Sequence, residues 1–173
     1  DIFPDLYRHA HPWLQPFLSS SLTVTTVLAI GLNLIMRIGI SRRATLKLTS
    51  GEHSSDTMFR FMENLGAGWG ARKDVVYRAV AAMNEFAEAI VHCGMEGRQI
   101  VMSAIFDELS LDIRITYENP PVEFPGERPD MAAIVEDPEA LARMSGFLVR
   151  HYSDRMKVSR EGERTRVDLH FDH

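Results

Sequence analysis

The sequence predicts an α+β protein, with an apolar N-terminal helix followed by a two-layer α/β sandwich. Helices are expected on one face of a mixed, mainly antiparallel sheet. Three observations predict this class. Residues 9–36 contain no Asp, Glu, Lys or Arg. Beyond them, stretches of alternating apolar and polar residues are interleaved with segments whose apolar residues repeat at helical spacing. Short links join neighbouring strands, as they do in antiparallel pairs.

The amino-acid composition excludes several classes of protein. The chain has 173 residues, of which 45% are hydrophobic and 25% charged, and this balance excludes a disordered chain. The net charge of −5 provides no general attraction for nucleic acid, so we expect no such partner. The single cysteine, Cys93, excludes an internal disulfide framework and a cysteine-rich zinc cluster. We expect no metal site.

The first predicted element is a membrane-spanning helix. Residues 21–40 would form a helix about 30 Å long, which matches the hydrocarbon thickness of a bilayer. Arg42, Arg43 and Lys47 follow, and basic residues directly after a span favour the cytoplasmic side. Residues 1–41 are therefore predicted to be an interfacial loop and a span, and residues 42–173 a cytoplasmic domain. A helix buried in a soluble protein, or packed in a dimer, remains the alternative.

The predicted domain opens with a strand and two helices. Residues 44–50 alternate apolar and polar side chains, which is typical of a half-buried strand. Residues suited to an N-cap precede an apolar run, so a helix begins near Ser55 and ends at the glycine-rich stretch 66–70. A longer helix runs from Asp74 to about Cys93, because its apolar residues are spaced four and three apart. Its core-facing stripe is Val76, Val80, Met83, Ala87 and Ile90.

Two hairpins and one helix complete the predicted domain. Four prolines within residues 119–130 forbid regular strand pairing there. Asp137 as a cap and Pro138 at the first helical position open the last helix. The predicted ranges are 98–106 and 110–117 for the first hairpin, 138–152 for the helix, and 155–160 and 164–171 for the second hairpin. Val167, Leu169 and Phe171 are expected to point into the core.

The best candidate for chemistry lies on the long helix. Asn84, Glu88 and His92 are spaced four apart and therefore form one stripe beside the apolar one. Amide and carboxylate oxygens at a core edge are suited to hold a metal–phosphate ligand. An exposed stripe with a weak Glu88–His92 pair is the alternative. His170 and His173, beside two aspartates, are interpreted as a solvated terminus rather than a metal site.

Two resemblances extend this interpretation. Residues 12–35, and above all Ala29-Ile-Gly-Leu-Asn-Leu34, resemble the final transmembrane segment of bacterial nucleobase permeases of the uracil/xanthine family. The remainder resembles the GHKL ATP-binding domain shared by histidine kinases and anti-sigma serine kinases. That likeness rests on the long helix with Asn84, Glu88 and His92, the hairpin after it, and residues 144–155 followed by two strands.

The GHKL resemblance implies an altered nucleotide pocket. In that family a helix carries Glu and, four residues later, an Asn that holds Mg²⁺, whereas Asn84 and Glu88 stand here in the reverse order. The loop Asp-x-Gly-x-Gly that reads adenine is replaced by residues 118–122, and the glycine-rich lid is reduced to Ser145 and Gly146. The implied vestigial cofactor-binding residues are Asn84, Glu88, His92, Ser145 and Gly146.

The two resemblances together imply a function. We expect a regulatory or interaction domain on the cytoplasmic side of a nucleobase permease in the bacterial inner membrane, with no catalytic residue and no cofactor. Its expected partners are the membrane and the remaining permease spans, and a homodimer stays open. The alternative is a serine kinase or ATPase of the anti-sigma type that binds ATP with Mg through Asn84 and Glu88.

Overall fold

The computed structural model describes residues 20–37, 41–51, 54–107, 109–118, 121–130 and 138–173. The chain divides into two compact units, residues 1–40 and 41–173, which are described separately. The predicted interfacial loop falls almost entirely within residues 1–19 and so lies outside the described residues. The predicted cap Asp137 also lies outside them.

Within the first unit the described residues form one helix, α2 (Ser21–Arg37), of 17 residues. The Thr25 and Thr26 hydroxyls donate back to the carbonyls of Ser21 and Leu22, at 2.7 and 2.8 Å. Helix α2 contains 17 of the 20 residues predicted to span a membrane, and the predicted span is not supported. Residues 38–40 lie outside the described part, and no helix within it is long and apolar enough to cross a membrane. The large apolar side chains of α2 are exposed nonetheless, from 56% to 80%: Leu22, Val27, Leu28, Ile30, Leu32, Leu34 and Ile35.

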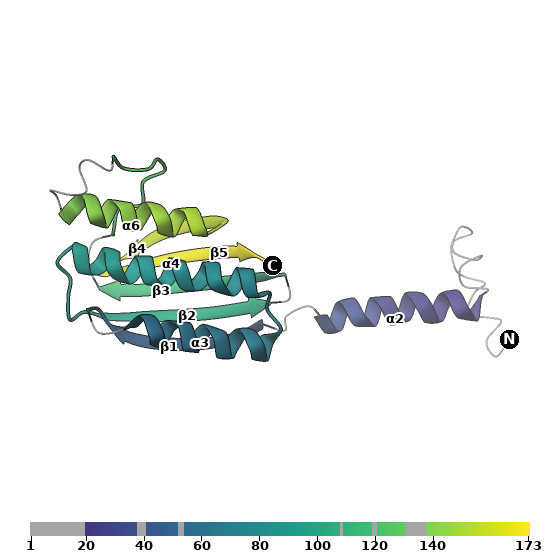
Figure 1. The fold of residues 1–173 in the computed structure, drawn as a ribbon. Helices are drawn as coiled ribbons and strands as arrows, with labels where there is room; N and C mark the ends of the chain where they lie inside the picture. Colours follow the sequence, from purple (N-terminus) through teal and green to yellow (C-terminus); the bar gives the residue numbers. More distant parts are fainter. Residues whose placement is uncertain (1–19, 38–40, 52–53, 108, 119–120, 131–137) are drawn as a thin grey trace. The chain divides into compact units, whose positions relative to one another are not determined.

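The second unit contains a five-stranded sheet in the order β1-β2-β3-β5-β4. Every pair of neighbouring strands is antiparallel, so the expectation of a mixed sheet is wrong. Two helices in succession connect β1 to its neighbour β2 (Figure 1). The last helix follows β3 and precedes β4, which lies at the far edge of the sheet, and β5 lies between β3 and β4. The strands are β1 (Ser41–Thr49), β2 (Gln99–Asp107), β3 (Ser110–Glu118), β4 (Arg155–Glu161) and β5 (Arg164–Asp172).

Three helices cover one face of this sheet: α3 (Ser54–Trp69), α4 (Lys73–His92) and α6 (Pro138–Tyr152) (Figure 1). The predicted apolar stripe of α4 is confirmed, because all five of its residues are buried. They pack with the inward residues of the strands. The predicted register of β5 is also confirmed, since Val167, Leu169 and Phe171 are buried in the same core. The result is the predicted two-layer α+β sandwich.

The glycine-rich stretch does not end α3 where the sequence suggested. The helix continues through Gly66 and Gly68 to Trp69. A Cβ on Gly66 would lie 2.8 Å from the Cγ2 atom of Val76, so glycine there allows α3 to pack closely against α4. The helix ends at Gly70, whose φ of +72° lies in the left-handed region that favours glycine.

Candidate functional site

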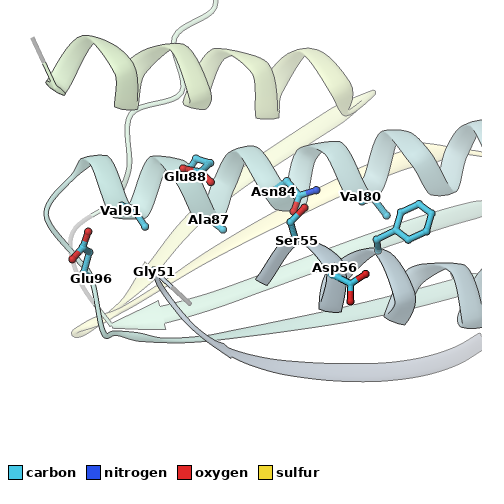
Figure 2. Close-up of a pocket in the computed structure, with 10 residues that line it drawn as sticks. Gly51, Ser55, Asp56, Val80, Asn84, Ala87, Glu88, Val91 and Glu96 are labelled. Atoms are coloured by element: carbon cyan, nitrogen blue, oxygen red, sulfur yellow. The ribbon is translucent and has the colours of Figure 1, made fainter. Parts of the chain in front are cut away.

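The stripe predicted on α4 is only partly assembled into a site. Asn84 and Glu88 line a cavity of about 860 Å³ between α4, the start of α3, and the residues Gly51 and Glu96. Figure 2 draws Asn84 next to Ser55 of α3, and Glu88 a turn further along α4, towards Glu96. Asn84 and Glu88 share this cavity because residues four apart on a helix lie on the same face.

The described ionisable residues that line this cavity are acidic. Among the described residues that line it, the ionisable ones are Asp56, Glu88 and Glu96, and none is Lys, Arg or His. Asp56 is paired with Arg60 at 3.0 Å, an exposed ion pair within α3. The amide oxygen of Asn84 is buried and has no hydrogen-bond partner. The remaining wall is apolar, formed by Phe59, Val80, Ala87 and Val91. A polyphosphate would meet repulsion here rather than a counter-charge.

His92 does not line this cavity. It lines a second cavity, of about 540 Å³, together with Cys93, Glu139 and Arg143. Its Nε2 atom lies 4.0 Å from Oε2 of Glu88, which is the weak exposed pair left open by the sequence. Burial raises the pKa of the Cys93 thiol, and the carboxylates of Glu123 and Glu139 raise it further. The thiol therefore stays protonated at neutral pH and is a poor nucleophile.

Ser145 and Gly146 do not form a lid. Both lie in the middle of α6 and both are buried. A Cβ on Gly146 would overlap the backbone carbonyl oxygen of Glu123, so this position admits only glycine without a shift of the backbone. The interpretation of these two residues as a reduced glycine-rich loop is thus wrong. Gly146 is a packing contact between α6 and the segment that follows β3.

That segment, residues 121–124, is fixed against the core. The backbone N–H of Val122 donates to the Tyr117 hydroxyl at 3.0 Å, and Val122 is buried. The ring of Phe124 stacks on Phe86 of α4, with 6.4 Å between ring centroids. Arg150 of α6 donates to the Phe124 carbonyl at 3.4 Å. These contacts tie the segment to β3, α4 and α6 at the place where the GHKL resemblance puts the adenine-reading loop.

A group that the sequence interpretation missed lies on the sheet. His170 Nδ1 is 2.6 Å from Asp112 Oδ1, and its Nε2 is 3.1 Å from Asp172 Oδ1. Partial burial lowers the pKa of His170, but the two carboxylates outweigh it and the net pKa is raised. His173 accepts a hydrogen bond from the backbone N–H of Arg72 at 2.7 Å. Both histidines are half-exposed and hydrogen-bonded, and the prediction of a solvated terminus did not include these contacts. The pairing of β3 with β5 places Asp112 directly opposite His170. A sequence analysis that predicted this pairing would also have predicted the His170–Asp112 contact.

No metal centre is assembled by these side chains. Within the described residues, no group of three or more His, Cys, Asp or Glu is placed to hold a metal ion.

Comparison with known proteins gives little beyond the fold. No protein-family model matches the sequence, and no curated protein matches it. Among solved structures, the chain is similar to the RsbU and RsbW domains of Rv1364c from Mycobacterium tuberculosis, at 14% identity and a TM-score of 0.49. The alignment covers 75% of this chain and 32% of that one, so the chain spans about a third of the length of that protein's structure.

Proposed function

We propose that residues 41–173 form a regulatory or protein-interaction domain of the GHKL type that does not hydrolyse ATP. The observation that carries the proposal is the separation of the five candidate nucleotide residues. Asn84 and Glu88 line one cavity, His92 lines another, and Ser145 and Gly146 are buried within α6. A nucleotide site needs its base, phosphate and metal contacts to converge on one ligand.

The packing of α6 beside α4 supports the same proposal. The first turns of α6 bury Ala140 and Ala142, and Val149 joins the hydrophobic core farther along the helix. Residues 121–124 close the adjoining space through the Phe86–Phe124 stack and the contact of Glu123 with Gly146. The cavity of about 540 Å³ beside this packing is lined by His92, but not by Asn84, Glu88, Ser145 or Gly146.

Electrostatics disfavour a triphosphate at Asn84 and Glu88. Three carboxylates line that cavity, and none of the lining residues that the structure describes is basic. Bound Mg²⁺ could offset part of the repulsion, and the test below therefore includes it. The alternative function, a serine kinase or ATPase of the anti-sigma type, depends on such Mg-dependent binding.

Calorimetry with Mg-ATP on the full chain distinguishes the two functions. We expect no heat of binding at millimolar nucleotide. Glu88→Ala should behave like the unmodified protein in this titration, and far-UV circular dichroism before and after checks that both samples are folded. Micromolar binding that Glu88→Ala abolishes would establish the nucleotide enzyme and overturn the proposal.

A finer proposal concerns the first unit. We propose that α2 is covered by lipid or by other helices of a nucleobase permease, and that residues 42–173 face the cytoplasm at the bacterial inner membrane. Seven large apolar side chains exposed on one helix support this, because water-exposed apolar surface of that extent needs a partner. Arg42, Arg43 and Lys47 follow the helix on the side that would be cytoplasmic.

A reporter fused after Lys47 tests this topology in bacterial cells. Enzymatic activity of a cytoplasmic reporter, together with recovery of the fusion in the membrane fraction, is the expected result. A reporter active only outside the inner membrane would reverse the orientation. Recovery of the fusion as a monomer in the soluble fraction would refute membrane attachment without touching the proposal for residues 41–173.

A further inference from the structure

The face of the sheet opposite the helices carries a second kind of site. Strand alternation turns Lys47, Val101, Thr116 and Arg166 to this face, because their neighbours Ile100, Tyr117 and Thr165 are buried on the other. These four residues are direct register partners, so they form one row across four strands. Val101 and Thr116, at the centre of the row, line a cavity of about 500 Å³.

Basic side chains surround this cavity. Arg98 and Arg164 line it together with Gln99 and the carboxylate of Glu118. Lys47 and Arg166 flank it in the row. Among the described residues, Arg98 and Lys47 take part in no side-chain ion pair. Four cations therefore meet two nearby carboxylates, in a chain whose net charge is −5.

The two carboxylates leave the arginines largely available. Arg164 Nε lies 3.7 Å from Glu118 Oε1, and Arg166 Nη1 lies 3.9 Å from Glu161 Oε1. Both separations exceed hydrogen-bond length, so the guanidinium donors are not consumed by these contacts. The Nε atom of Arg166 is buried and has no acceptor. An unsatisfied cationic donor is costly, and an anion beside it would relieve that cost.

We propose that this cavity binds a phosphate group. Arginine presents a planar fork of donors that matches phosphate oxygens, and the Thr116 hydroxyl and Gln99 amide supply neutral donors beside it. The small cavity accommodates a phosphate with a modest substituent. The phosphate could belong to an anionic lipid headgroup or to a soluble molecule, and both share the chemistry that these residues recognise.

The test uses the full chain in a neutral detergent, titrated with inorganic phosphate against chloride at equal ionic strength. Calorimetry should detect phosphate binding in the unmodified protein. The double substitution Arg98→Gln and Arg164→Gln should weaken it about tenfold, the loss expected when charge-assisted hydrogen bonds are removed. Arg60→Gln with Lys73→Gln removes the same two positive charges from the exposed surfaces of α3 and α4, and this matched control should leave phosphate binding unchanged.

A second arm identifies the source of the phosphate. Hydrogen exchange of residues 97–101 and 116–118 is compared in nanodiscs of phosphatidylcholine alone and with phosphatidylglycerol. Slower exchange only with phosphatidylglycerol assigns the site to a lipid headgroup, and binding only of free phosphate assigns it to a soluble ligand. Absence of both effects would overturn the proposal, as would equal weakening by the control pair Arg60→Gln and Lys73→Gln. If the double variant is unfolded, Arg98→Gln alone serves, because its side chain supports no ion pair.

Discussion

At the scale of single residues, Gly146 shows how one missing side chain positions a whole segment. Its α-carbon faces the backbone of residues 123 and 124 so closely that a Cβ would overlap the Glu123 carbonyl. Glycine is unfavourable inside a helix by about 1 kcal/mol relative to alanine, so its presence in α6 has a local cost. The cost is offset by the approach of the 121–124 segment to α6 and by the burial of Val122 and Phe124 that follows.

Replacing this glycine should therefore destabilise the fold. We expect Gly146→Ala to lower the free energy of unfolding by about 1–3 kcal/mol, because the new methyl group forces the segment or the helix to move. Chemical denaturation measures the loss. Gly68→Ala is the matched control, since it also lies within a helix but a Cβ there meets nothing within 4 Å. The control should be neutral or stabilising, and equal losses in both variants would contradict the packing argument.

His170 couples stability to pH through its two carboxylates. Burial opposes the charged imidazole, but hydrogen bonds to Asp112 and Asp172 raise the pKa of His170 above its ordinary value. A group whose pKa is higher in the folded state binds its proton more tightly there, so its contribution to stability is complete below the unfolded pKa of about 6.5. That contribution is lost as the pH rises through the folded pKa.

We predict that the stability lost in His170→Gln, measured as a free energy of unfolding, becomes smaller as the pH rises. Unfolding free energies of the unmodified protein and of His170→Gln, measured by denaturant titration from about pH 5.5 to 8.5, should differ most at the acidic end. His151→Gln on the exposed surface of α6 is the control and should give no such trend. A difference that grows towards alkaline pH would show that the hydrogen bonds favour the neutral ring.

At the scale of elements, β5 is the strand that connects the edge strand β4 to the rest of the sheet. It lies between β3 and β4 and pairs with both, so its inward residues face the core from the interior of the sheet. Leu169 stands opposite Ile113 on one side and Met156 on the other. Strand β4 is joined to the rest of the sheet through β5.

A charge on the inward face of β5 should unfold much of the domain. Leu169→Asp places an unpaired carboxylate in the core and should cost on the order of 3 kcal/mol or more. The melting temperature measures this, with Lys157→Asp on the exposed face of β4 as a control expected to change stability by less than about 1 kcal/mol. An unchanged melting temperature in Leu169→Asp would mean that the register is wrong.

At the scale of the whole molecule, the two units differ in how they meet water. Residues 41–173 bury a continuous core under three helices, whereas α2 leaves its apolar side chains exposed. Apolar surface of this kind is normally covered by lipid, by a partner or by a second copy. The acidic excess of the chain lies entirely in residues 42–173, although two arginines and only one carboxylate line the cavity on the face of the sheet opposite the helices.

In buffer without detergent, α2 should drive association of the full chain. Sedimentation velocity should show larger species at higher concentration, and Leu28→Lys with Leu32→Lys should shift them towards monomer. Val158→Lys changes an exposed apolar residue of β4 and serves as the control, with no effect on association. A monomer at every concentration in the unmodified protein would mean that α2 needs no partner.

The sequence alone determined which segments became helices and strands. Alternation and helical spacing are local properties, and the periodic segments of residues 44–171 were recognised from them. The apolar stripe of α4 and the inward face of β5 followed from the same patterns. The charge-free N-terminal run likewise predicted a helix, and α2 forms over 17 of the 20 residues predicted, the other three lying outside the described residues.

Only the tertiary structure decided which residues meet. The separation of Asn84 and Glu88 from Ser145 and Gly146 depends on how α6 packs beside α4 and on where residues 121–124 lie. The His170–Asp112 contact depends on β5 pairing with β3, a choice that no local pattern encodes. The sequence predicted that Gly66 helps to end a helix. In the structure the helix continues through it, and the missing side chain makes room for Val76 of α4, a contact that depends on how the two helices pack. Periodicity reports the environment of a single element, whereas a site is a set of distances between elements.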